Sequence, residues 1–266
     1  MTEGYHSISL TVEAGVASLT MRRPAALNSL SPDMMIELRD ALEVVDGDPD
    51  TRVLLLSGEG RAFCAGADLS NAGPSADPTA PRDVGLVCED YVNPLMRRLA
   101  AMKKPSIAAV NGAAAGIGCA LAMHCDFVIA ARSSYFMLAF ARVGLIPDGG
   151  TTWLLPRLVG IMRATRMMML GERIAAEQAA EWGLATQVCE DEDLAIQAAE
   201  LARKLAAGPT KAYGLMRSAM RSGQSSDLDA AMGLERAFQR EAGFTQDYAE
   251  GVRAFKEKRA ANFTGA

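Results

Sequence analysis

The stretch that decides the fold is Pro105–Asp126, which reads PSIAAVNGAAAGIGCALAMHCD. Its first part, Ser106–Val110, is a run of β-branched residues and alanine with the length of one buried strand. Asn111-Gly112 ends this run with residues typical of a turn. After small residues and glycines, Cys119–His124 indicates a buried helix. A strand, a glycine turn and a helix start direct unpaired backbone N–H groups at one point, so we expect this turn to hold a negative group.

The segments on either side predict an α/β protein. Tyr5–Val12 and Val16–Met21 alternate apolar and polar residues, which predicts a hairpin, and Ser31-Pro32 is a typical helix start. Further strands are predicted at Val53–Leu56, Phe127–Ala131, Tyr135–Phe140 and around Val188, and helices at Asp83–Met102, Thr151–Leu158, Arg163–Leu170, Ala175–Trp182, Asp191–Ala207, Pro209–Arg221, Asp227–Glu241 and Thr245–Arg259. Strand–loop–helix units therefore come first and helices alone follow, which predicts a parallel-sheet core over residues 1–200 and a C-terminal helical region over residues 201–266.

The composition excludes several classes of function. The formal net charge of −5 argues against a nucleic acid partner, because a phosphate-binding face needs clustered Lys and Arg. The five cysteines form no CxxC pair, so we expect no metal site and interpret them as core thiols. No signal peptide and no apolar run of about 18 residues is visible. We therefore expect a cytoplasmic protein that does not enter a membrane.

Two loops share one design. Phe63–Asp68 and Ala115–Gly118 each follow a buried strand, and both consist mainly of small residues. If the two strands are neighbours, each loop places one N–H at a shared point, which is the arrangement of an oxyanion hole. The spacing alone also fits two tight turns that need small residues for packing. The segment Asn71–Arg82, with three prolines, is interpreted as a surface loop or lid.

Four ordered motifs resemble the crotonase, or enoyl-CoA hydratase/isomerase, superfamily. They are FCAGADL, KKPSIAAVNGAAAGIG, GLIPDGGTTWLLPRLVG and FKEKRAANF, and the resemblance runs from about Ile8 to Phe263. It implies the crotonase (ClpP-like) fold, a spiral of β-β-α units with a C-terminal helical region that makes oligomer and CoA contacts. It also implies a homotrimer or a dimer of trimers, an acyl-CoA thioester substrate, and no cofactor other than the coenzyme A of that substrate.

The resemblance implies which residues form the site. The two N–H donors to an enolate oxygen fall on Ala67 and Ile117, where Ile117 adds a side chain that would narrow the pocket. Phe255 and Lys258 match positions that reach the adenine and phosphates of CoA, often the CoA of a neighbouring subunit. A basic residue is often found where Ala25 stands, so Arg22 or Arg23 would have to replace it. Further substrate contacts are expected from Ala65, Gly66, Asp68, Leu69, Gly116 and Phe140.

The two glutamates of the family's hydratases are absent. Their positions, three residues after the glycine loop and twenty further on, carry Ala120 and Phe140. Hydration needs one group to activate water and another to handle the α-carbon proton. Alanine and phenylalanine can do neither, so the sequence argues against ordinary hydration.

One carboxylate remains, at Asp148. In the dienoyl-CoA isomerase branch an Asp at this place shuttles a proton, and the GLIPD segment resembles the ring-1,2-epoxyphenylacetyl-CoA isomerase branch of phenylacetate degradation. An Asp is a weak base with a pKa near ~3.9, and apolar surroundings raise this value toward a useful range. The resemblance therefore implies an isomerase, acting by double-bond migration or epoxide-to-oxepin rearrangement. Pro-Asp-Gly-Gly is also common turn chemistry, which leaves a structural interpretation of Asp148 open.

Three alternatives remain. A dehalogenase branch has an Asp at the Asp148 position but needs a His where this chain has Asn93, and His124 is interpreted as a core residue. A hydratase-like enzyme with atypical catalytic residues is the second alternative. A non-catalytic homologue that only binds acyl-CoA is the third.

Overall fold

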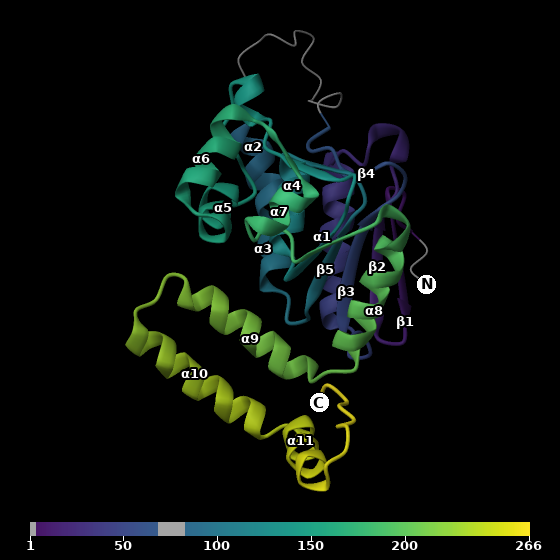
Figure 1. Ribbon diagram of the computed structural model, residues 1–266, viewed down its shortest axis with the longest axis vertical. Coiled ribbons are helices and arrows are strands. Elements are labelled where there is room, and N and C mark those ends of the chain that lie inside the picture. The colour runs from purple at the N-terminus through teal and green to yellow at the C-terminus, as the bar shows by residue number, and fades with distance from the viewer. Residues whose placement is uncertain (1–3, 69–82) are drawn as a thin grey trace.

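A computed structural model describes residues 4–68 and 83–266 (Figure 1). Leu69 and the predicted lid Asn71–Arg82 lie outside these residues. The strands are β1 (Ile8–Glu13), β2 (Val16–Met21), β3 (Val53–Gly58), β4 (Ala62–Cys64), β5 (Ser106–Val110), β6 (Ala113–Ala115), β7 (Phe127–Ala131), β8 (Tyr135–Met137), β9 (Arg173–Ala175) and β10 (Gln187–Cys189). The helices are α1 (Pro32–Gly47), α2 (Gly85–Val87), α3 (Asn93–Ala101), α4 (Ile117–His124), α5 (Thr151–Val159), α6 (Ile161–Leu170), α7 (Ala176–Glu181), α8 (Leu194–Ala206), α9 (Thr210–Gly223), α10 (Leu228–Gly243) and α11 (Gln246–Glu257).

The strands form two sheets whose connectivity is a spiral. The larger sheet has the order β1-β2-β3-β5-β7-β10, and the smaller one has the order β4-β6-β8-β9. All pairs are parallel except the predicted hairpin β1–β2 and the pair β8–β9. The successive strand pairs β3–β4, β5–β6 and β7–β8 each place their first strand in the larger sheet and their second in the smaller one. This arrangement confirms the predicted spiral of β-β-α units.

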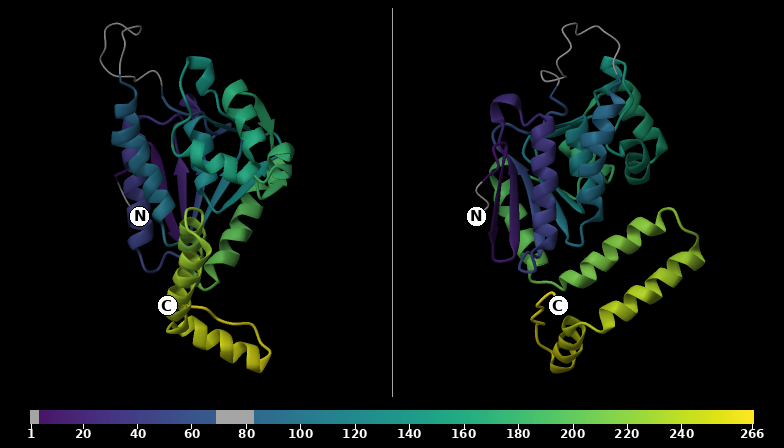
Figure 2. Two further views of the ribbon diagram at one scale, coloured as in Figure 1. Left: turned by 90° about the vertical axis from the view of Figure 1, so that its left-hand side faces the viewer. Right: turned by 180° about the vertical axis from the view of Figure 1, so that it is seen from behind.

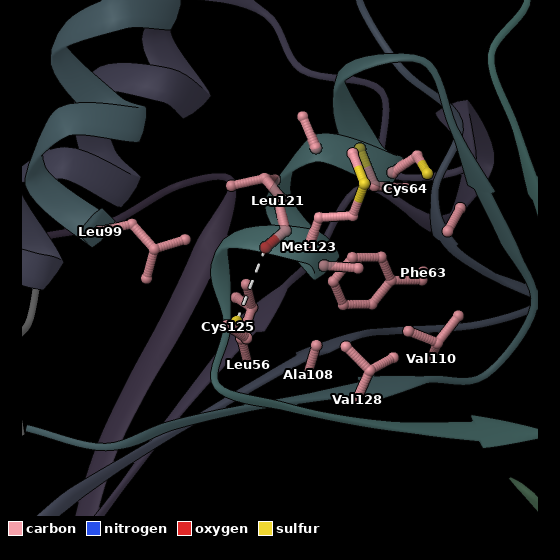
Figure 3. Packing of buried hydrophobic residues seen from close by; sticks show 14 of the residues in the cluster. Leu56, Phe63, Cys64, Leu99, Ala108, Val110, Leu121, Met123, Cys125 and Val128 are labelled. Atoms are coloured by element: carbon pink, nitrogen blue, oxygen red, sulfur yellow. Dashed lines mark hydrogen bonds between the residues drawn. The ribbon is translucent and has the colours of Figure 1, made fainter. Parts of the chain in front are cut away.

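The larger sheet is buried on both faces. Alternate residues along a strand point to opposite faces, so Val53, Ile107 and Ile129 pack against α8 while their neighbours face the other way. On that second face, Figure 3 shows Leu56, Ala108, Val110 and Val128 below Phe63 and the α4 residues Leu121 and Met123. Every residue of α4 is buried. The opening stretch thus forms a strand and a helix at the centre of the molecule.

Helix α1 begins as predicted. The Ser31 side chain accepts a hydrogen bond from Met34 N, and Pro32 is the first helical residue. The side chains of the predicted apolar stripe are at most 3% exposed; they are Met34, Leu38, Leu42 and Val45.

The C-terminal helices lie apart from the sheets. Helices α9 and α10 form an antiparallel pair at one end of the molecule, and α11 lies beyond them (Figures 1 and 2). Helix α4 lies among the sheets, away from this end of the molecule (Figure 1). Among the described residues, no helix has both the length and the hydropathy needed to cross a membrane.

The structure corrects three details of the predicted elements. The short strands β4 and β6 fall in segments predicted as loop or turn, and β9 falls between the predicted helices Arg163–Leu170 and Ala175–Trp182 and includes the first residue of the second, because three residues give no readable alternation. The strand predicted over Tyr135–Phe140 ends at Met137, and Phe140 starts a 3-10 turn. The helix predicted from Asp83 to Met102 contains a π-helical turn at Cys88–Val92.

Candidate active site

The two glycine loops lie in direct contact. Strands β4 and β6 are parallel neighbours, so the loops that follow them leave the same edge of the smaller sheet. Gly66 and Gly116 both have positive φ, +104° and +52°, which favours glycine. A β-carbon at Gly66 would come within 3.1 Å of the Ala115 carbonyl oxygen. The absence of side chains therefore lets the two loops meet, as predicted from their shared design.

Both predicted donors have an uncommitted N–H. On either side of Ala67, Gly66 O accepts from Leu30 N and Asp68 N donates to Leu30 O, so the N–H of Ala67 points away from Leu30. Ile117 is the first residue of α4, where N–H groups lack internal partners. Within residues 4–68 and 83–266, neither N–H donates to a protein acceptor. The Ile117 side chain is 2% exposed and packs into the main core, which differs from the expectation that it narrows the pocket.

An ion pair anchors the end of the first loop. Arg23 Nη2 lies 2.7 Å from Asp68 Oδ2, and the Asp68 side chain is 6% exposed. Arg23 also donates to Ser29 O, and Arg22 pairs with Glu59 at 3.1 Å. Both arginines that were considered as replacements for a basic residue at Ala25 are thus paired with carboxylates. Asp68 consequently shapes the loop that carries Ala67.

Asp148 lies in a turn that packs against the middle and the end of α4. Thr151 N donates to the Asp148 carbonyl oxygen at 3.0 Å. His124 Nε2 lies 2.9 Å from Gly149 O, and a β-carbon at Gly149 would lie 3.0 Å from the Ala120 β-carbon. The structure therefore confirms the predicted turn. The side chain of Asp148 in this turn is only partly exposed to solvent.

The carboxylate of Asp148 is partly buried. Its Oδ1 is fully buried and has no hydrogen-bond partner among the described residues. Burial raises the pKa of Asp148 above its ordinary value. Oδ2 accepts a hydrogen bond from Cys88 Sγ at 3.7 Å, which opposes that rise.

Cys88 is the site residue that the sequence did not reveal. The other four cysteines are buried, as expected for core thiols, whereas Cys88 is only partly buried. Its contact with Asp148 joins residues 60 positions apart. The pattern around Cys88 gives no signal for this contact, because the π-helical turn that holds it has no sequence signature comparable to a cap or a glycine turn.

The positions of the two missing glutamates adjoin the glycine loop. Ala120 is fully buried and lies three residues after Ile117, on the same face of α4. The Phe140 ring lies 3.8 Å from where a β-carbon of Gly116 would stand. At the two positions where the resemblance places the acidic groups of a hydratase, this chain thus has a methyl group and an aromatic ring.

A comparison with known protein families decides the family to which this fold belongs. The enoyl-CoA hydratase/isomerase family model matches residues 11–266. The chain belongs to the enoyl-CoA hydratase/isomerase family. The 1,2-epoxyphenylacetyl-CoA isomerase of Escherichia coli strain K12 is 51% identical over 255 residues, covering 96% of this chain and 97% of that protein. This likeness agrees with the branch suggested by the GLIPD segment.

Hydratases of the family are similar to the chain as well. The crotonyl-CoA hydratase of Syntrophomonas wolfei is 36% identical, with 97% of this chain and 98% of that protein covered. The crystal structure of an enoyl-CoA hydratase from Bacillus anthracis superimposes with a TM-score of 0.91 at 34% identity, covering 98% of this chain and 100% of that one. Membership thus establishes an enzyme of this family, while the reaction must be argued from the side chains.

Two predicted CoA contacts of this family member lie away from the loops within one chain. Phe255 is on α11 and is 85% exposed, and Lys258 ends that helix in a left-handed conformation. Helix α11 lies at the end of the molecule beyond α9 and α10, away from α4 among the sheets (Figure 1). Asn93, which stands where a dehalogenase needs His, is the first residue of α3 and donates to Glu89.

Proposed function

We propose that this family member is an acyl-CoA isomerase that moves one proton through Asp148. The observation that carries the proposal is a partly buried carboxylate with a raised pKa, packed against a site whose hydratase glutamates are replaced by Ala120 and Phe140. The N–H groups of Ala67 and Ile117 hold the thioester oxygen and stabilise the negative charge that forms on it. Ala65, Gly66 and Gly116 bring the backbone close to that oxygen.

The first candidate reaction is double-bond migration in an enoyl-CoA. Asp148 takes a proton from C2 of a 3-enoyl-CoA, and the electron pair delocalises into the thioester as a dienolate. The same carboxyl group returns the proton to C4, which gives the 2-enoyl-CoA. Because one proton leaves and one returns, the reaction needs no cofactor and no water.

The second candidate reaction is rearrangement of a ring epoxide in an aromatic acyl-CoA to an oxepin. It is supported by the name of the Escherichia coli relative, a 1,2-epoxyphenylacetyl-CoA isomerase. The apolar character of Ala120 and Phe140 suits an acyl group that is not to be hydrated. Both reactions need the same oxyanion donors and leave the substrate's composition unchanged.

A solvent-exchange experiment tests the proposal without knowledge of the natural acyl group. With 3-hexenoyl-CoA in deuterated buffer, we expect conversion to 2-hexenoyl-CoA and incorporation of deuterium at C2 and C4, measured by NMR. Binding of the thioester without exchange would instead identify a non-catalytic acyl-CoA-binding protein. Hydration of crotonyl-CoA at enzyme-like rates would contradict the proposed roles of Ala120 and Phe140 and favour an atypical hydratase.

We further propose that α11 binds the CoA of a neighbouring subunit in a homotrimer or a dimer of trimers, as suggested by the distance between Phe255 and the glycine loops. Phe255→Ala should then raise the KM for the CoA ester about tenfold with kcat unchanged, because stacking on a base contributes about 1–3 kcal/mol. Steady-state kinetics measures KM and kcat, and light scattering measures the oligomeric state. The matched control is Phe244→Ala, another exposed phenylalanine of this region, and an equal rise in KM for both variants would contradict stacking by Phe255.

A further inference from the structure

The Asp148 carboxylate has one side-chain hydrogen-bond donor among the described residues. That donor is Cys88, whose Sγ lies 3.7 Å from Oδ2. The other oxygen, Oδ1, is buried without a partner. Buried polar side-chain atoms normally have at least one hydrogen-bond partner. Besides the backbone N–H of Asp148 itself, the Cys88 thiol is the described group that donates to this carboxylate and favours its charged form.

The local backbone explains how Cys88 reaches Asp148. Cys88 begins the π-helical turn Cys88–Val92, in which Asn93 N donates to Cys88 O. A π turn adds a residue to the helical repeat and thereby changes the direction of the side chains before it relative to those after it. The residues after the turn, such as Leu95 and Leu99 of α3, are buried in the main core. Cys88 packs against the edge of that core, where it contacts the Asp148 turn.

We propose that Cys88 is a positioning residue for Asp148, whose S–H group fixes the rotation of the carboxylate and favours its charged form. The inference rests on the proposed function, because it assigns to Cys88 a role in the proton transfer that Asp148 performs. Cys88 itself exchanges no proton with the substrate. The effect is reciprocal: burial and the neighbouring Asp148 together raise the pKa of the Cys88 thiol, which keeps the thiol protonated and able to donate.

Other ionisable groups near the turn act less directly. Asp83 precedes Cys88 by five residues in the chain. Its negative charge also raises the pKa of the Cys88 thiol. His124 from α4 and Arg97 from α3 line a small hollow beside Gly149 and Gly150. The His124 ring contacts the Gly149 carbonyl oxygen, and burial lowers its pKa, so the ring stays neutral near pH 7. Within the described part of the chain, neither His124 nor Arg97 forms a hydrogen bond with the Asp148 carboxylate.

The pH profile of kcat/KM on 3-hexenoyl-CoA tests the inference. Asp148 must be ionised to accept a proton, so the acid limb of the profile follows its pKa. Removal of the donor in Cys88→Ala should move this limb to higher pH by about 0.5 unit, a modest shift because a thiol is a weak donor. Cys88→Ser, which keeps a donor, should move the limb back. An unshifted limb in the Ala variant, or equal shifts in both variants, would contradict the inference.

A labelling experiment tests the same contact without catalysis. Iodoacetamide reacts with the thiolate, and Cys88 is the least buried of the five cysteines. In Asp148→Asn the midpoint of Cys88 labelling against pH, followed by mass spectrometry, should fall by about 0.5 unit because a neighbouring negative charge is gone. Asp90→Asn, an exposed acid two residues from Cys88, should leave it unchanged. An unmoved midpoint in Asp148→Asn contradicts the inference, whereas a wild-type enzyme that labels as expected but does not isomerise contradicts only the proposed function.

Discussion

Asp148→Asn should bind acyl-CoA as the wild type does and lose about 10³-fold or more in kcat, at the upper part of the range for a general acid–base group. The amide has the size and shape of the carboxyl group but cannot accept the substrate proton. Binding should be preserved because, in the proposed site, the thioester is held by the N–H groups of Ala67 and Ile117, which the substitution does not touch. Turnover of 3-hexenoyl-CoA and calorimetric binding of a saturated acyl-CoA measure the two effects separately.

The control for this prediction is Asp90→Asn, which removes an exposed carboxylate close in sequence to the candidate site and should leave kcat unchanged. Wild-type turnover in Asp148→Asn would contradict the proton shuttle. The pH dependence follows from the same role. Because burial raises the pKa of Asp148, the wild-type rate should be full above that raised pKa and fall as the pH drops through it.

The packing around Ala120 supports the proposed site with a single carboxylate. A β-carbon at Gly149 would lie 3.0 Å from the Ala120 β-carbon, so the Asp148 turn occupies the space beside α4 that a longer side chain at position 120 would need. Gly149 has φ of +61° and its carbonyl oxygen contacts His124. The loss of the glutamate and the approach of the Asp148 turn are therefore linked sterically. A site with one carboxylate can return a proton to the substrate but has no second group to activate water.

Most of the larger sheet could be predicted because its strands are long enough to show a pattern. Ser106–Val110 and Phe127–Ala131 are buried runs of the expected length, and both matched the structure at their ends. The smaller sheet could not be predicted from residue patterns alone. Each of its four strands has only three residues, too few for a readable alternation, and only β8 lies within a predicted strand, Tyr135–Phe140.

In the candidate site, too, features set by neighbouring residues could be predicted, whereas contacts between residues far apart in the sequence could not. The proposed N–H donors at Ala67 and Ile117 could be suggested from glycine turns, which constrain the backbone locally. Asp148 was suggested by a family motif, since Pro-Asp-Gly-Gly alone fits any turn. The Cys88–Asp148 contact joins residues 60 positions apart and depends on a π-helical turn. The residues near Cys88 in the sequence therefore do not predict it.

Ile117→Pro should lower kcat by about 10²–10³-fold, because removal of one oxyanion donor costs about 2.7–4 kcal/mol. Proline has no N–H and is well tolerated at the first position of a helix, where its fixed φ suits the helical backbone. Ile117 is the first residue of α4, and its N–H donates to no acceptor among the described residues. The substitution thus removes the proposed donor without breaking a hydrogen bond of the folded chain.

The matched control is Ile117→Ala, which keeps the N–H and also loses the buried side chain. Truncation of a buried isoleucine costs about 2–5 kcal/mol of stability, so both variants should show a lowered Tm, and thermal unfolding identifies the conditions under which both are folded. Under those conditions the difference in kcat between the Pro and Ala variants measures the N–H alone. If the two variants turn over 3-hexenoyl-CoA at equal rates, Ile117 N is not an oxyanion donor. A large difference would mean that the glycine turn of Pro105–Asp126 acts through its backbone, so that the side chain at position 117 can vary as long as its N–H remains.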